Sequence, residues 1–214
     1  MESLQEILAP TGDPIIHEQK VGTGDNYTET QDDGSIIRYG NATTWDDLVG
    51  SLISRRLTSV SGRLDYDFDE NAIVMQNNGD PTNNADRLIF NYQKPHKAKQ
   101  NSEFRLHIHW EQDTTNKIEW QIDYRIQINN ELKTTAWTTT TANSDDNNVF
   151  TYPGTGTFIQ ITNLAVIDLS AASLSSTIQF RLTRTDTTTG NILAVFVDAH
   201  YEIDSDGSRQ EFIK

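Results

Sequence analysis

Cysteine is absent from this chain of 214 residues, and basic side chains are scarce. Without cysteine, the chain can form neither disulfides nor thiolate metal sites. Its 17 Lys and Arg residues are outnumbered by 31 Asp and Glu residues, which gives a net charge of −14. Such a chain repels nucleic acid and anionic membrane surfaces, so we expect no nucleic-acid partner and instead a neutral, cationic or polar one.

Long hydrophobic runs and catalytic motifs are also missing. No apolar run approaches the roughly 18 residues of a membrane-spanning helix, so we expect no membrane insertion. Residues 1–10 lack the basic and apolar regions of a secretory signal, which predicts synthesis in a cytosol. The sequence has no nucleophile elbow, phosphate loop, dinucleotide fingerprint or zinc-protease helix. We therefore expect a protein that is not an enzyme and that has no cofactor, apart from the metal considered below.

The first 39 residues have no clear period and are rich in glycine and polar side chains. Their apolar residues form small islands that are too sparse for a core but suit shallow grooves on another subunit. We therefore expect residues 1–39 to be an extended N-terminal arm, with a disordered tail as the alternative, and residues 40–214 to form one domain. The candidate assembly residues of the arm are Leu4, Ile7, Leu8, Ile15 and Ile16.

One short helix is predicted just after the arm. Thr44 can cap a helix, and Asp46 and Asp47 would then complement the helix dipole in the first turn. Gly50 should end this helix early.

From residue 64 onward, apolar residues recur with a period of two, which is typical of half-buried strands. Short turn segments separate the runs and favour antiparallel pairing. The pattern predicts an all-β, antiparallel β-sandwich of the jelly-roll type with roughly eight to ten strands. Two faces should meet in its core: Phe104, Leu106, Ile108 and Trp110 on one, and Ile118, Trp120, Ile122, Tyr124, Ile126 and Ile128 on the other.

The second of these runs, residues 117–129, is too long for one flat strand. Thirteen residues at ~3.3 Å each would span about 43 Å, well beyond the usual strand. We expect a bend, a bulge or a hairpin that projects beyond the sandwich.

Three histidines are candidate metal ligands. His107 and His109 lie on the same face of a predicted strand, about 6.5–7 Å apart at their Cα atoms. Both imidazoles can lean toward one ion, and His200 in the predicted last strand is the candidate third ligand. The alternative is that these histidines pack or hydrogen-bond on a polar face. With a carboxylate, the same three would also suit a metal-dependent enzyme of the cupin type.

The tryptophans raise the question of a sugar-binding platform. Trp110 and Trp120 fall on the predicted apolar faces, so we expect them in the core. Trp137 has polar neighbours and is therefore the candidate contact with a ligand or partner.

Three segments resemble a family of virion structural proteins of tailed phages, known from environmental and marine phage genomes. They are Trp45-Asp46-Asp47-Leu48, the His-x-His-Trp segment at 107–110, and His-Tyr-Glu-Ile-Asp at 200–204. The family pattern often has proline between the histidines, whereas this chain has Ile108. The resemblance implies a non-catalytic part of the particle surface, either a head decoration or fibre or a tail appendage or adaptor.

This resemblance also implies partners and a location. The protein would be made in the host cytoplasm, would belong to the virion as a homotrimer, and would attach through its arm to other virion proteins. The alternative is a carbohydrate-binding module that contacts a host surface glycan during adsorption.

Overall fold

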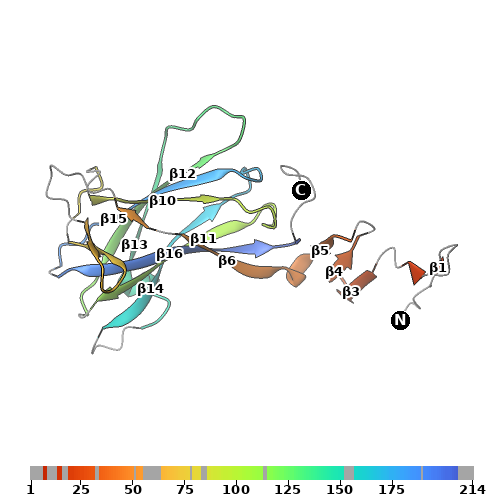
Figure 1. Cartoon of the computed structure of the whole chain (residues 1–214), viewed down its shortest axis with the longest axis horizontal. Helices are drawn as coiled ribbons and strands as arrows, with labels where there is room; N and C mark the ends of the chain where they lie inside the picture. Colours follow the sequence, from red (N-terminus) through yellow and green to blue (C-terminus); the bar gives the residue numbers. More distant parts are fainter. Residues whose placement is uncertain are drawn as a thin grey trace.

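A computed structural model of the chain describes residues 7–8, 14–15, 19–31, 34–50, 52–54, 64–77, 79–82, 86–112, 115–151, 157–188 and 190–206. Two antiparallel sheets dominate it (Figure 1). The five-stranded sheet has the order β13 (Thr138–Asn143), β12 (Glu119–Gln127), β15 (Thr177–Arg184), β10 (Leu88–Gln93) and β7 (Ile53–Ser54). The six-stranded sheet contains β14 (Phe158–Asp168), β11 (Glu103–Gln112), β16 (Ile192–Ile203), β9 (Ala72–Met75), β8 (Leu64–Asp67) and, paired with β16, β6 (Thr44–Gly50).

This arrangement confirms the all-β, antiparallel class and the sandwich. The two sheets together hold a little more than the roughly eight to ten strands expected. The jelly-roll connectivity stays a prediction.

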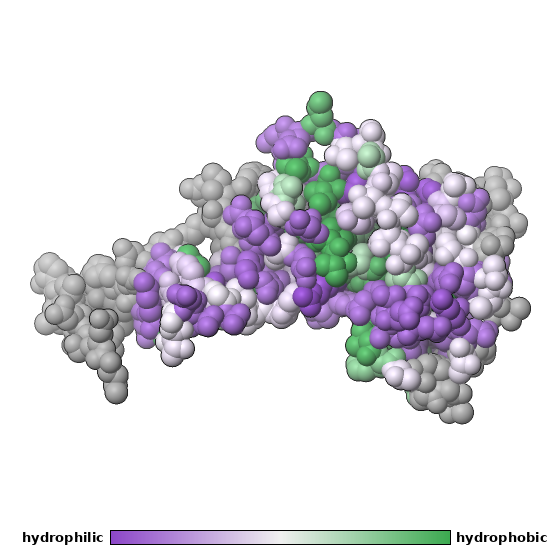
Figure 2. All heavy atoms as spheres, turned by 180° about the vertical axis from the view of Figure 1, so that it is seen from behind, coloured by the Kyte–Doolittle hydropathy of each residue, from purple (hydrophilic) through white to green (hydrophobic). Residues whose placement is uncertain are grey.

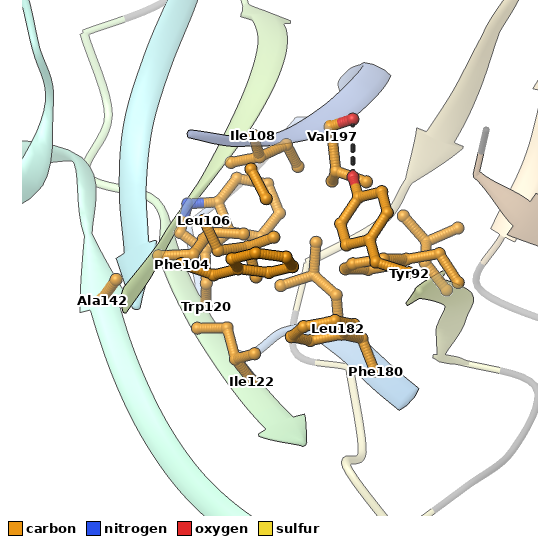
Figure 3. Close-up of a cluster of buried hydrophobic side chains, with 14 of the residues drawn as sticks. Tyr92, Phe104, Leu106, Ile108, Trp120, Ile122, Ala142, Phe180, Leu182 and Val197 are labelled. Atoms are coloured by element: carbon orange, nitrogen blue, oxygen red, sulfur yellow. Dashed lines mark hydrogen bonds between the residues drawn. The ribbon is translucent and has the colours of Figure 1, made fainter. Parts of the chain in front are cut away.

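The core lies between the two sheets, where the two predicted faces meet (Figure 3). Trp110 of β11 and Trp120 of β12 are both fully buried, and their rings contact edge to face with centroids 5.8 Å apart. Phe90 and Phe180 stack at 4.8 Å. The alternation of apolar and polar residues therefore predicted the inward side chains of β11 correctly. Tyr124 and Ile126, at the end of β12, are partly buried and pack against the core.

A hydrogen bond joins the two sheets through this core. The hydroxyl of Tyr92 in β10 donates to the carbonyl of Val197 in β16 at 2.9 Å, as Figure 3 shows. The Tyr92 ring also lies against Gly50, where an added Cβ would come within 2.6 Å of a ring carbon. Any larger residue at position 50 would push β6 away from the core.

The short helix expected from Thr44, ending at Gly50, is wrong. Residues 44–50 form β6, which pairs with β16 so that Leu48 lies opposite Ala199. Pairing with β16 supplies backbone hydrogen bonds along one side of this segment, and Leu48 packs against the core while Val49 faces outward. Tertiary pairing thus overrides the local capping signal.

Helices are short in the described part of the chain. They are a 3₁₀ turn, η1 (Gly40–Ala42), and α1 (Ser144–Asn147), whose N-cap Asn143 accepts hydrogen bonds from the backbone of Asp145 and Asp146. Neither approaches the length that a membrane-spanning helix requires.

The long run at 117–129 forms a shorter strand than its pattern suggested. β12 ends at Gln127 and keeps a continuous register with β15, so the expected bulge is absent from this pairing. Its pairing with β13 stops at Tyr124. The connection to β13 then rises beyond the sheet as a loop (Figure 1).

The N-terminal segment lies outside both large sheets and extends from one end of the sandwich (Figure 1). It holds the pair β1 (Ile7–Leu8) and β2 (Pro14–Ile15) and a three-stranded sheet of β3 (Gln19–Thr23), β4 (Asn26–Thr30) and β5 (Ile36–Arg38). Ile7 lies opposite Ile15, whereas Leu4 and Ile16 fall outside the described residues. Arg38 joins this arm to the sandwich: its backbone N–H donates to the carbonyl of Asp204 at 2.6 Å, and its side chain pairs with Asp206 at 3.0 Å.

Candidate metal centre

Two of the three candidate histidines meet on the outer face of the six-stranded sheet. On β11, core residues alternate with outward ones, so His107 points away from Trp110 and its neighbours. Strand β16 runs beside β11 and places Asp198 directly opposite His107. His200, two residues further along β16, lies on the same face, and its ring centroid is 4.3 Å from that of His107.

His107, Asp198 and His200 form a compact set of ligand atoms, which we call the His–Asp cluster. One ligand atom from each lies within 4.8 Å of the other two. The distance from Nδ1 of His107 to Oδ1 of Asp198 is 3.6 Å, and that from Nε2 of His200 to Oδ2 of Asp198 is 3.0 Å. Two imidazoles therefore flank the two oxygens of one carboxylate.

His109 is close to this cluster, and of its three members it contacts Asp198. Its Nε2 lies 3.3 Å from Oδ1 of Asp198, and its ring stacks on Phe196 at 4.0 Å. It is therefore placed to orient Asp198 from outside the cluster. The structure thus groups Asp198, and not the predicted His109, with His107 and His200.

The inner part of the cluster is shielded from solvent. His107 and Asp198 are 6% and 5% exposed. Nδ1 of His107 and Oδ1 of Asp198 are buried without a hydrogen-bond partner. Burial raises the pKa of Asp198, but the adjacent imidazoles of His107 and His109 outweigh it and hold this pKa below its usual range. The carboxylate is therefore negatively charged at neutral pH.

The outer part of the cluster opens to solvent through His200, whose side chain is 40% exposed. Asp47 of β6 approaches the same nitrogen, with its Oδ1 3.2 Å from Nε2 of His200. The arrangement offers two imidazoles and one or two carboxylates, a donor set that suits borderline divalent ions such as Zn²⁺.

Asp198 is the residue that sequence reasoning missed. A signal for it was present, because Asp198 is a charged residue that directly follows the apolar run Ile192–Val197 and shares its outward face with His200. What the pattern did not reveal was the register that sets it opposite His107.

Trp137 lies elsewhere, beside the five-stranded sheet. Its ring is partly exposed and makes cation–π contacts with two guanidinium groups. The Cζ atoms of Arg125 and Arg181 lie 4.3 and 3.7 Å from the ring centroid. Arg125 also donates to the carbonyl of Thr134 at 3.2 Å, which ties the projecting loop to β12. A sugar stacking on Trp137 would compete with these arginines for the ring.

We expect Trp137→Ala to lower the free energy of unfolding by only about 1–2 kcal/mol, the contribution of two partly exposed cation–π contacts. Urea unfolding followed by circular dichroism would measure it. A loss of several kcal/mol would show that Trp137 belongs to the structural core.

Comparison of the chain with protein-family models, with curated proteins and with solved structures finds no match. The phage-virion resemblance of the three sequence segments stays a prediction.

Proposed function

We propose that this protein is a non-catalytic structural component of a tailed-phage virion, displayed on the particle surface and attached through its N-terminal arm. The observation that carries the proposal is the arm itself. Its sheet β3–β4–β5 stands outside the sandwich, and Glu29 is the single buried residue in the described part of that sheet. The coloured part of the arm is mainly hydrophilic in Figure 2.

A small sheet of this kind needs a covering surface. Three strands are stable by themselves only with a hydrophobic face or with packing against another element. Within the described chain this sheet has little of either: Val21 is 63% exposed, β5 is only half-buried, and β5 meets the end of the sandwich through a bridge from Ile37 to Ser205 and the contacts of Arg38. Another protein subunit that covers the sheet would supply the missing contacts, as an attachment arm on a particle requires.

The segments that carry the resemblance also come together in space, although they are far apart in the sequence. Strands β11, β16 and β6 are neighbours, so that Trp45 lies opposite Glu202 and His107 opposite Asp198. The guanidinium of Arg105 in β11 lies 4.4 Å from the ring centroid of Trp45. A shared surface of this kind supports a common structural role for the three segments.

Mass spectrometry of purified particles tests this proposal most directly. The protein should be found in virions at a copy number consistent with a symmetric oligomer, and a homotrimer is the form that the resemblance favours. Its absence from purified virions would overturn the proposal.

Removal of residues 1–39 tests the role of the arm. We expect the remaining sandwich to fold, because its core contains no arm residue, and to lose oligomerisation or particle attachment. Circular dichroism, sedimentation and a virion-binding assay would measure these outcomes. An unfolded product would place the arm in the domain core, and normal assembly would make the arm a dispensable tail.

Arg38→Ala in the full-length chain is the matched control. It removes the ion pair to Asp206 but keeps the arm. An exposed ion pair contributes about 0–1 kcal/mol, so this variant should fold and assemble.

A further inference from the structure

We infer that the His–Asp cluster of His107, Asp198 and His200 is a binding site for one divalent transition-metal ion, with Zn²⁺ the best match. This inference is independent of the proposed function. It rests on the geometry of three residues from two paired strands and on the two buried polar atoms within that geometry.

The spacing of the ligand atoms fits such an ion. Metal–ligand bonds of about 2.0–2.1 Å in a tetrahedron place neighbouring ligand atoms about 3.3 Å apart. The nitrogen of each imidazole lies at a comparable distance from one oxygen of the Asp198 carboxylate, His200 at 3.0 Å from Oδ2 and His107 at 3.6 Å from Oδ1. One ligand atom from each of the three residues lies within 4.8 Å of the other two, which is close enough for the three side chains to share one ion.

The unpartnered atoms favour a metal over a simple hydrogen-bond network. Buried polar atoms almost always have a partner, and a buried nitrogen or oxygen without one calls for an explanation. Nδ1 of His107 and Oδ1 of Asp198 are two such atoms, they belong to side chains more than nine-tenths buried, and they face each other. A cation would satisfy both, because the Asp198 oxygen presents lone pairs and Nδ1 of His107 presents one in the tautomer that carries its proton on Nε2.

The donor chemistry selects the class of ion. Imidazole nitrogens suit zinc, copper, nickel and iron, whereas Mg²⁺ and Ca²⁺ prefer sites made of oxygen alone. The side chain of Asp47 or a water molecule would take the fourth position, on the exposed side of His200. His109 would hold the carboxylate of Asp198 in place, as outer-shell groups of metal sites commonly do.

The bound ion would fasten β11 to β16 on the side of the sheet opposite the core. His107 comes from β11 and the other two ligands come from β16. Because an ion that binds the folded state stabilises it by mass action, the melting temperature should rise with the concentration of free Zn²⁺.

Titration of the full-length, chelator-treated protein tests the inference. Zn²⁺ should bind by isothermal titration calorimetry with one ion per chain, and Co²⁺ should give the visible absorption of a site that contains nitrogen ligands. Excess Mg²⁺ and Ca²⁺ should not displace either ion. Displacement by these ions would mean that the many carboxylates of this acidic chain bind the metal, and it would overturn the inference.

Variants then locate the site. His200→Ala alters a partly exposed side chain and should leave the fold intact, while it weakens Zn²⁺ binding by at least the roughly 10–100-fold that follows loss of an outer-shell group. His107→Ala should do the same, and circular dichroism without metal checks its folding. His96→Ala is the matched control, because this imidazole contacts Ser175 in another part of the sandwich. Equal Zn²⁺ affinity in His200→Ala and His96→Ala, or no binding by the parent chain, would overturn the assignment.

Discussion

Replacing Trp120 with alanine should lower the free energy of unfolding by about 3–5 kcal/mol. The indole of Trp120 is fully buried and contacts Trp110 across the core, so the substitution leaves a large cavity between the two sheets. The surrounding strands cannot collapse into this cavity, since their register is fixed by β13 and β15 on either side of β12. Urea unfolding at neutral pH would measure the loss.

Trp120→Phe provides the matched control for this prediction. Phenylalanine keeps an aromatic ring against Trp110 and removes an indole N–H that has no hydrogen-bond partner. We therefore expect Trp120→Phe to lose clearly less stability than Trp120→Ala. Equal losses in the two variants would mean that cavity volume does not set the effect at this position, and a loss near that of Trp137→Ala would contradict the burial of Trp120.

The alternation of apolar residues predicted these core side chains because the local pattern decides which face of a strand can be buried. Phe104, Leu106 and Ile108 alternate with polar residues, and a strand with that pattern has only one face that can be buried. Residues 44–50 show the limit of this reasoning. Thr44 and the acidic residues after it match a helix start, but the segment forms a strand because β16, about 150 residues later, offers an unpaired edge. A local pattern does not contain that information.

The candidate metal centre was predictable in part for the same reason. The spacing of His107 and His109 set both on one face, and His200 was correctly expected near them. Which groups meet depends on the register of β11 against β16, and a shift by one residue would turn Asp198 to the other face. The register also changes between His109 and Trp110, which no sequence pattern marked.

Removing the carboxylate of Asp186 should have the second large effect on stability. Arg184 and Asp186 are 1% and 4% exposed in their side chains and form two hydrogen bonds of 2.8 and 2.9 Å. The guanidinium also donates to the carbonyls of Met75 and Gly190, so the pair links β15 to the end of β9 and to the turn before β16. Asp186→Ala leaves a buried, uncompensated positive charge, and we expect a loss of about 3–5 kcal/mol.

The pair should also make stability depend on pH in a defined direction. Burial raises the pKa of Asp186, but hydrogen bonds from Arg184 and Thr188 outweigh it and hold the pKa below its usual value of 3.8. A carboxyl with a lowered pKa in the folded state stabilises the protein above its unfolded pKa, and this contribution disappears as the pH falls through the folded pKa. The parent chain should therefore lose this part of its stability only in acid, and Asp186→Ala should lack that part of the acid dependence.

A double-mutant cycle separates the ion pair from the other contacts of these side chains. Arg184→Met combined with Asp186→Leu removes both charges, so neither is left buried alone. We expect the double variant to lose less stability than the sum of Arg184→Met and Asp186→Leu measured singly, with a coupling of about 0.5–3 kcal/mol at neutral pH. The coupling should shrink as the pH falls and Asp186 becomes protonated. Additive losses at neutral pH would show that the two side chains stabilise the sandwich independently, through Met75, Gly190 and Thr188 instead of through each other.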